Sequence, residues 1–296
     1  MTQKTYKKIS LDTLNFFGTK SYYGYRKENG HKVKVIYDIP KSLELMIKNT
    51  KFYEDNYKYV IYPPYSNLTA KYYVVDMSTI KAASILADKD LITNVGILNF
   101  ASATKAGGGW LNGKVAQEED IMRKTTVFPS LVIQDKFYQL DKYNDYYSDS
   151  IIYTPKVYII KDDNFNYCPI REISVVTCAA INLTKIKNNP YALNWLTSYN
   201  NTNNIDYISY RMKERMKKIL YSFIENNITN IVLGAFGCGV FGHDAKMISN
   251  IWKELLMDEG YEHYFENVVF AILDNSPNKY NYNCFVNDFG YTNSLI

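Results

Sequence analysis

The sequence predicts an α/β fold in which helices cover both faces of a central sheet, a three-layer α/β/α sandwich. Four short apolar runs lack polar alternation, which is typical of strands buried on both faces of a sheet. Helical patterns separate these runs along the chain, so strands and helices alternate. A chain of 296 residues is long enough to bury one large core of this kind. The four runs are residues 95–100, 173–178, 231–236 and 268–273.

Weaker elements of the same kinds precede residue 90. Residues 32–37 alternate as a strand does, and residues 72–75 are a further strand candidate. Residues 78–86 fit a helix, which Asp76 or Ser78 can cap.

The composition around residue 90 gives no sign of a separate domain. No linker rich in Pro, Gly or Ser divides this first part of the chain from the rest, and no internal repeat is evident. We therefore expect an N-terminal accessory segment, residues 1–90, packed on a core formed by residues 91–296.

The clearest helix pattern lies between the second and third apolar runs. It extends from Ile205 to about Asn226, and a second helix is expected from about Ala245 to Met257. The apolar stripe of the first consists of Ile205, Ile208, Met212, Met216, Ile219 and Phe223. Five basic side chains are expected off this stripe on a solvated face, namely Arg211, Lys213, Arg215, Lys217 and Lys218.

The overall composition excludes some classes of function. Lys and Arg number 34 against 30 Asp and Glu, a net charge of +4 that is too small and too dispersed to predict nucleic-acid binding. The 29 tyrosines and the Asn-rich tracts fit a genome-wide codon bias better than a base-stacking surface. We therefore expect no direct requirement for nucleic acid.

The four cysteines and the terminal residues bear on the compartment. Cys168, Cys178, Cys238 and Cys284 show neither CxxC spacing nor a companion histidine pattern, which favours reduced thiols and no metal site. The first residues lead into no apolar signal region, and no apolar run reaches the ~18 residues of a membrane span. We expect an intracellular protein, cytoplasmic or nuclear, with no membrane partner.

Two glycine-rich loops follow two of the predicted core strands. Gly107-Gly108-Gly109 comes after the strand that ends at Phe100, and residues 234–242 come after the strand at 231–233. In α/β sheets this is where backbone N–H groups meet phosphates. Neither loop has the Gly-Lys-Ser/Thr ending of a P-loop or the GxGxxG pattern of dinucleotide sites. Each alone fits a simple tight turn, but the pair favours a phosphate site.

Acidic residues follow the first glycine loop, at what the pattern indicates is the start of a helix. Carboxylates are common in a first helical turn because of the helix dipole. Glu118 and Glu119 project about 100° apart on a helix, so they can take different roles. A helix N-terminus lowers the pKa of a carboxyl group, so work as a general acid would need burial or a neighbouring anion to raise it again.

Three further residues near these loops remain ambiguous. Asn99 at a strand end is either a local backbone partner or an amide that contacts a ligand. His243 fits a capping or surface residue better than a catalytic one. Cys238 between glycines fits a need for small size, although a thiol nucleophile stays open.

Together these residues resemble the microbial type of poly(ADP-ribose) glycohydrolase (PARG), which is built on a macrodomain. The glycine triplet followed by Gln117-Glu118-Glu119 is similar to the GGG and QEE signature of that family. The resemblance covers most of the chain and extends to residues 9–14, 98–103, 110–113, 123–131, 153–155 and 234–242. It implies a macrodomain with a mixed central sheet, preceded by the accessory segment.

The resemblance also implies roles for the site residues. Glu119 would be the general acid and then the general base in hydrolysis of a ribose–ribose O-glycosidic bond, and Glu118 would hold ribose hydroxyls. The implied substrate-binding set is Asn99, Gly107, Gly108, Gly109, Gln117, Gly237, Cys238, Gly239, Val240 and Phe241. Val240 and Phe241 would position the terminal ribose, and Asn99 the distal ribose.

The implied partners are poly(ADP-ribose) or an ADP-ribosylated macromolecule as substrate and ADP-ribose as product, with no cofactor or metal and a monomeric protein. Ile181, Met77 and His243 depart from the residues usual in the family, which affects the adenine side of the site. Two alternatives stay open. One is an ADP-ribosyl hydrolase acting on another linkage, and the other is a module that binds ADP-ribose without cleaving it.

Overall fold

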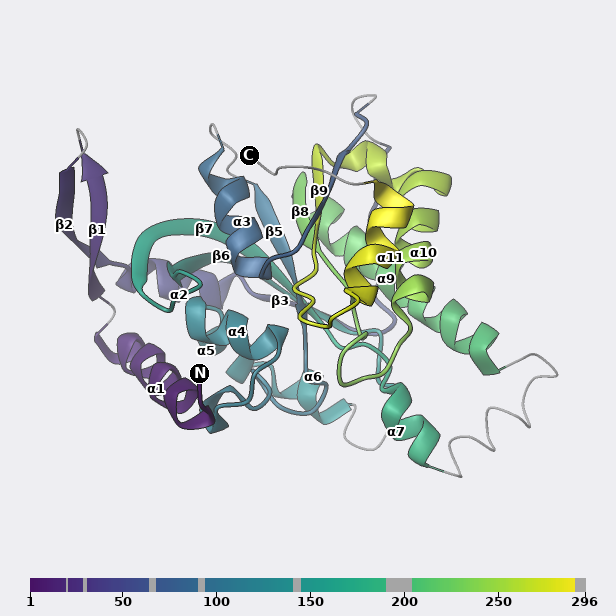
Figure 1. Ribbon diagram of the computed structural model, residues 1–296, viewed down its shortest axis with the longest axis horizontal. Coiled ribbons are helices and arrows are strands. Elements are labelled where there is room, and N and C mark those ends of the chain that lie inside the picture. Colours follow the sequence, from purple (N-terminus) through teal and green to yellow (C-terminus); the bar gives the residue numbers. More distant parts are fainter. Residues whose placement is uncertain are drawn as a thin grey trace.

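A computed structural model describes residues 1–19, 21–28, 31–63, 68–89, 94–140, 145–189 and 204–290 (Figure 1). Its centre is a seven-stranded sheet with the strand order β3-β6-β7-β5-β8-β9-β4. The strands are β3 (Lys51–Tyr53), β4 (Lys71–Val75), β5 (Val95–Phe100), β6 (Ile151–Lys161), β7 (Tyr167–Cys178), β8 (Asn230–Leu233) and β9 (Asn267–Ala271).

The sheet is mixed, as predicted. Strands β7, β5, β8, β9 and β4 are parallel neighbours, whereas β6 pairs antiparallel with β7 and β3 pairs antiparallel with β6. Because the carboxyl ends of parallel strands lie along one edge, the loops after β7, β5 and β8 leave the sheet side by side. This edge brings the two glycine loops together.

Helices cover both faces of the sheet and confirm the three-layer α/β/α fold (Figure 1). Side chains alternate along β5. Leu98 lies in the hydrophobic cluster on one face of the sheet, with Met212 and Trp252. Ile97 lies in the cluster on the other face, with Met46 and Leu86. Within the described ranges, no helix is long and apolar enough to cross a membrane. The first group of helices, on the face of Ile97, is α2 (Pro40–Lys48), α3 (Thr79–Asp88), α4 (Gln117–Lys124) and α5 (Phe128–Val132), and the second, on the face of Leu98, is α9 (Asn204–Glu225), α10 (Ala245–Lys253) and α11 (Tyr280–Phe289).

Shorter elements complete the fold. A π-helical turn, Glu254–Asp258, continues α10, so the helix predicted to end near Met257 changes its hydrogen-bond pattern before it ends. The others are α6 (Asp135–Leu140), α7 (Leu183–Asn188) and the 3₁₀ turns η1 (Trp110–Asn112) and η3 (Tyr261–Tyr264).

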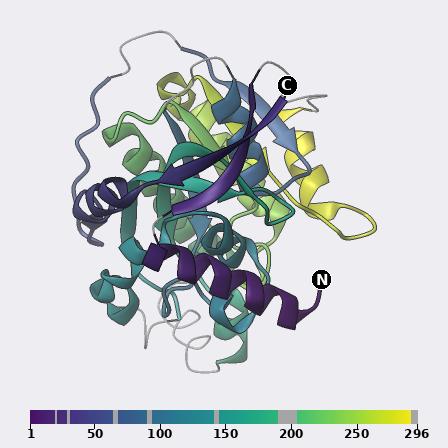
Figure 2. The same ribbon diagram turned by 90° about the vertical axis from the view of Figure 1, so that its left-hand side faces the viewer.

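The N-terminal helix α1 (Gln3–Thr19) lies across the outside of the first helix layer (Figure 2). Its buried side chains are Ser10, Thr13 and Phe16, and Ser10 Oγ donates a 2.6 Å hydrogen bond to the carbonyl oxygen of Trp110. Arg123 of α4 is also buried and donates to the same carbonyl and to that of Lys114. The turn that follows the first glycine loop is therefore held by α1 and α4 together.

The remaining N-terminal elements lie at the margins of the fold. Strands β1 (Ser21–Glu28) and β2 (His31–Asp38) form an antiparallel hairpin outside the main sheet (Figure 1). By contrast, β3 and β4 are the two edge strands of the main sheet. The division into a segment of residues 1–90 and a core of residues 91–296 stays a prediction.

Most predicted elements are confirmed, but the third and fourth core strands are shorter than expected. β8 ends at Leu233 and β9 at Ala271 rather than at residues 236 and 273. The carbonyl of Gly234 accepts a bond from Trp252 Nε1 instead of from a neighbouring strand. Predicted helix 78–86 is α3, and its cap is Ser78, whose Oγ accepts a hydrogen bond from the N–H of Lys81.

One basic residue of α9 contradicts the prediction of a solvated face. Arg215 is 0% exposed. It lies three residues after Met212 and four before Ile219, so it is on the apolar stripe rather than off it. A long cationic side chain is buried in this way only with partners, and those of Arg215 are described below.

We predict that Gly96→Ala in β5 destabilises the fold. A methyl group there would lie 2.6 Å from Cε1 of Phe223 and 2.7 Å from Cγ2 of Ile228, which overpacks the contact between β5 and α9. The free energy of unfolding in urea should fall by about 1–3 kcal/mol. Gly18→Ala is the matched control, because no atom lies within 4 Å of its added methyl and α1 should gain roughly 0.5 kcal/mol. Equal effects of the two substitutions would contradict the prediction.

Candidate active site

Two adjacent carboxylates at the start of α4 are the centre of the site. Glu118 and Glu119 are only 4% and 7% exposed. Glu118 Oε2 accepts a 2.8 Å hydrogen bond from the N–H of Ser102, and Glu119 Oε1 accepts a 2.9 Å bond from the N–H of Gly109. These bonds join the first turn of α4 to the loop after β5. The second oxygen of Glu119 makes no hydrogen bond with the described residues, so it is available to a ligand.

The middle glycine of the first loop is required by this packing. Gly108 has a φ of +59°, which residues other than glycine rarely adopt. A methyl group at this position would lie 2.7 Å from Glu119 Oε1 and 2.8 Å from Glu118 Oε2. The backbone can approach both carboxylates because no Cβ is present.

Gln117 fixes the start of α4 on the sheet. Its Oε1 accepts a 2.8 Å bond from the N–H of Phe100, and its Nε2 donates to the carbonyl of Leu98 at 2.6 Å and to Oγ1 of Thr79 at 3.2 Å. The amide is thus engaged with β5 and α3. Its predicted contact with substrate stays a prediction, and the observed bonds give it a clear role in placing the two glutamates.

Glu118 and Asn99 each bury an oxygen atom that has no hydrogen-bond partner among the described residues. These atoms are Glu118 Oε1 and Asn99 Oδ1, and the Asn99 amide nitrogen donates to Thr177 Oγ1 at 3.3 Å. An unpaired buried polar atom costs about 1–3 kcal/mol. Both oxygens are therefore suited to pair with hydroxyl groups of a bound ligand.

Burial also changes the acidity of Glu118. Desolvation raises the pKa of Glu118 to about 8, and the nearby charge of Glu119 acts in the same direction. The N–H of Ser102 and the amide of Asn99 lower it and only partly offset the effect. At pH 7 the carboxyl group of Glu118 is mostly protonated and can donate a hydrogen bond.

The second glycine loop lies on the other side of the β5 end and is held tightly at its base. Gly237 has a φ of +80°, and a methyl group there would lie 2.7 Å from the ring of His243 and 2.9 Å from Cβ of Ala180. Near the tip of the loop, Val240 is 80% exposed and Phe241 is half-buried. These two side chains are accessible to a ligand at the edge of the sheet.

His243 is neither a cap nor a surface residue, so the prediction for it was wrong. The ring is buried, and Nε2 lies 2.7 Å from the carbonyl oxygen of Ile181. Burial, together with the charge of Arg215, lowers the pKa of His243 to about 4, so the ring is neutral at pH 7 and Nε2 donates to that carbonyl. The helix cap is the next residue, Asp244.

Cys238 is not suited to act as a nucleophile. Burial raises the pKa of its thiol far above the usual range, so the thiolate form is scarce at pH 7. Its Sγ lies 3.9 Å from the carbonyl oxygen of Phe236. Across the described parts of the chain, no three His, Cys, Asp or Glu side chains come together as a ligand set for a metal ion.

A surface pocket of about 480 Å³ lies elsewhere, beside β3 and β6. It contains no residue of either glycine loop and neither glutamate, so it is separate from the site. Its lining consists of Lys48, Asn49, Thr50, Lys51, Tyr153, Pro155, Lys156 and Asn226.

The two glycine loops and the buried glutamate pair meet at the edge of the sheet where α/β folds bind ligands, and a pair of carboxyl groups is what most glycoside hydrolases use. The catalytic-domain model of microbial-type PARG matches residues 15–162, which is half of the chain. The chain belongs to this family of glycosidases that act on poly(ADP-ribose). No curated protein sequence matches the chain significantly.

Solved structures of bacterial PARG proteins agree with this assignment. The enzyme from Thermomonospora curvata superimposes with a TM-score of 0.82 at 26% identity, over 97% of this chain and 100% of the other. Its complex with the inhibitor ADP-HPD gives 0.79 at 25% identity, over 96% and 99%. The enzyme from Deinococcus radiodurans in complex with ADP-ribose gives 0.71 at 27% identity, over 88% and 100%. The predicted macrodomain fold and family are confirmed.

Some residues that shape the site had not been predicted. The N–H of Ser102 holds Glu118, and Thr184 binds the second glycine loop through its N–H to the carbonyl of Phe241 and its Oγ1 to that of Val240. Ser102 lies in the stretch 98–103 that resembles the family, but its residue type does not mark its role, because it acts through its backbone N–H. Thr184 follows a different strand, β7, and no sequence pattern marks it.

We predict that Glu118 makes stability depend on pH. The folded protein keeps the proton on Glu118 up to about pH 8, whereas the unfolded chain loses it near pH 4.5. The free energy of unfolding of the wild type should therefore fall, relative to Glu118→Gln, as the pH rises from 4.5 to 8. Relative to Glu118→Gln, the free energy of unfolding should fall by roughly 4–5 kcal/mol over this range, since each pH unit between the two pKa values contributes about 1.4 kcal/mol. Urea unfolding of both proteins across this range measures it, and a difference independent of pH would contradict the prediction.

Proposed function

We propose that this chain hydrolyses the ribose–ribose O-glycosidic bond of poly(ADP-ribose) and releases ADP-ribose, with Glu119 as general acid and then general base. The observation that carries the proposal is the intact glutamate pair on α4, with Glu119 fixed by the N–H of Gly109. A module that only binds ADP-ribose would have no need of a positioned acid. Membership of the PARG family supports the same substrate.

In the proposed reaction, backbone N–H groups of the two glycine loops bind the diphosphate. Glu118 is protonated near neutral pH, because burial raises its pKa to about 8, and it holds ribose hydroxyls. Val240 and Phe241 position the terminal ribose at the mouth of the site. These contacts place the glycosidic oxygen beside the oxygen of Glu119 that makes no hydrogen bond with the described residues.

The chemical step needs one group that works twice. Glu119 donates its proton to the leaving ribose oxygen as the glycosidic bond breaks, and the anomeric carbon gains oxocarbenium character. The negative diphosphate held nearby stabilises this positive charge. The carboxylate of Glu119 then accepts a proton from water as the water attacks the anomeric carbon. The products are ADP-ribose and a polymer shortened by one unit, and Glu119 regains its proton.

We also propose that the enzyme acts inside the cell. All four cysteines lie in described ranges and none is in a disulfide, which suits a reducing compartment. Imaging of a tagged protein in cells would distinguish the cytoplasm from the nucleus.

We predict that Glu119→Gln removes turnover but keeps binding. Loss of a general acid–base group typically lowers kcat by about 10²–10⁴-fold. The amide oxygen can still accept the N–H of Gly109, so the Kd for ADP-ribose should change by less than about threefold. Release of ADP-ribose from purified polymer gives kcat, and calorimetry gives Kd. The matched control is Glu54→Gln, at an exposed residue that pairs with Lys136 away from the site.

The comparison of substrates tests the alternatives. Wild-type protein that binds ADP-ribose but releases none from the polymer would be a binding module. Faster turnover on mono-ADP-ribosylated protein or DNA than on the polymer would identify a hydrolase for another linkage. Either result would overturn the proposal.

A further inference from the structure

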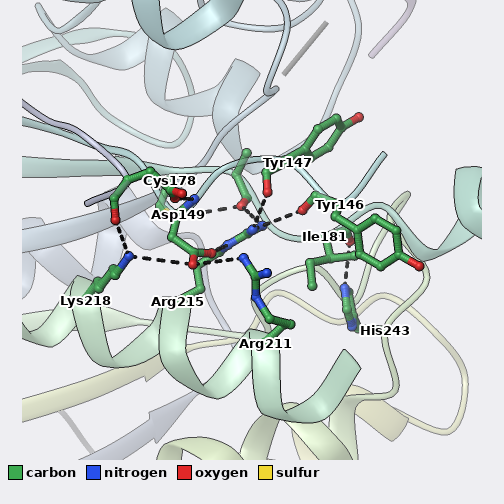
Figure 3. A network of polar contacts seen from close by, with 11 residues as sticks. Tyr146, Tyr147, Asp149, Cys178, Ile181, Arg211, Arg215, Lys218 and His243 are labelled. Atoms are coloured by element: carbon green, nitrogen blue, oxygen red, sulfur yellow. Dashed lines mark hydrogen bonds and ion pairs between the residues drawn. The ribbon is translucent and has the colours of Figure 1, made fainter. Parts of the chain in front are cut away.

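A buried guanidinium group on α9 joins two loops beside the site (Figure 3). Arg215 is 0% exposed and donates four hydrogen bonds. Nε donates to Asp149 Oδ1 at 2.8 Å, and Nη1 donates to the carbonyl of Ala179 at 2.7 Å. Nη2 donates to the carbonyls of Tyr146 and Tyr147, at 3.0 and 2.9 Å. Three of the four bonds therefore end on backbone carbonyls.

The carboxylate partner of Arg215 is itself well anchored. Asp149 Oδ2 lies 3.1 Å from Arg211 Nη2 and 3.6 Å from Lys218 Nζ, and its N–H donates to Asp55 Oδ1. Burial favours the neutral acid, but Arg215 and Arg211 outweigh it and hold the pKa of Asp149 below its usual value. With Nε fixed on Asp149, the planar guanidinium group of Arg215 holds the loop before β6 and the loop after β7 in a fixed position relative to each other.

The contact to the site passes through Tyr147. Its backbone has a φ of +58°, which is uncommon for a residue with a side chain and needs support from its surroundings. The bond from Arg215 to its carbonyl supplies that support. The ring of Tyr147 is buried and packs against Phe241, with 6.0 Å between the ring centroids. Phe241 is the residue of the second glycine loop that the proposed function places against the terminal ribose.

A second connection reaches the same loop from the end of β7. Arg215 holds the carbonyl of Ala179, and two residues later the carbonyl of Ile181 lies 2.7 Å from His243 Nε2. Thr184 then bonds the carbonyls of Val240 and Phe241. The segment that Arg215 fixes is thus the one on which the second glycine loop rests.

We propose that Arg215 is a positioning residue for the reaction, which sets Phe241 against the terminal ribose by holding the backbone of Tyr147 and Ala179. The proposal rests on the proposed function, because that function assigns the ribose contact to Phe241. Arg215 itself touches no substrate. Ion pairing alone does not account for the arrangement, since Arg211 already pairs with Asp149 at lower cost in burial.

A double-mutant cycle tests this role. Arg215→Lys keeps the charge but loses the planar fork, and Phe241→Leu removes the ring that receives the effect. Each single variant should lower kcat/KM on poly(ADP-ribose) by about tenfold or more, because a shift of about 1 Å in the site has effects of this size. The kcat/KM of the double variant should be no more than about twofold lower than that of Phe241→Leu alone. Lys213→Met is the matched control on the same helix, because Lys213 pairs with Glu254 and Glu259 and not with Asp149, and it should keep kcat/KM within about twofold.

The fold and the proposed function are measured separately. Thermal unfolding of each variant shows how much stability is lost, and Tyr147→Leu replaces Arg215→Lys in the cycle if the latter does not fold. If wild-type protein has no turnover, the proposed function fails and the same cycle is measured on the Kd for ADP-ribose. If the losses of kcat/KM in the two single variants multiply in the double variant, the inference is overturned. So would an Arg215→Lys protein that keeps wild-type kcat/KM and Kd.

Discussion

The structure depends on one constraint, the burial of two neighbouring carboxyl groups at the start of α4. The hydrogen bonds to Glu118 and Glu119 come from the backbone N–H groups of Ser102 and Gly109. Such donors reach a carboxylate only if the loop approaches without a Cβ, which explains the glycine at 108. The same burial raises the pKa of Glu118 to about 8 and leaves buried oxygens that a sugar can satisfy. The raised pKa of Glu118 and its unpaired oxygen, which a ligand can bind, therefore have the same cause, the burial of the carboxyl group.

Two buried arginines support the two loops that surround this pair. Arg123 donates to the carbonyls of Trp110 and Lys114, directly after the first glycine loop, and Ser10 of α1 shares the carbonyl of Trp110. Arg215 donates to the carbonyls of Tyr147 and Ala179 beside the second loop. In both cases a fixed fork of donors binds backbone carbonyls of loops and turns, and the carbonyl of Trp110 also accepts the N–H of Gly113. Loops rich in glycine are thereby given a defined shape.

The sequence predicts the central parallel strands because their apolar runs are continuous, and it predicts Glu118, Glu119 and the glycine loops because their residue types are unusual at that spacing. It does not predict β6, since Pro155 argues against a strand, and the register of β6 with β7 shifts between Thr154 and Val157. Helix α1 is obscured because two of its three buried side chains, Ser10 and Thr13, are polar. The burial of Arg215 and His243 depends on carbonyls distant in sequence, which no local pattern encodes.

In the proposed mechanism, the two glycine loops present the substrate's glycosidic oxygen to Glu119 and not to Glu118. A crystal structure of Glu119→Gln with a bound ADP-ribose dimer measures this directly. We expect the side chain at position 119 to lie about 3 Å from the oxygen that joins the two riboses, with ribose hydroxyls on Glu118. A glycosidic oxygen that lies beside Glu118, or beyond the reach of both glutamates, would contradict it.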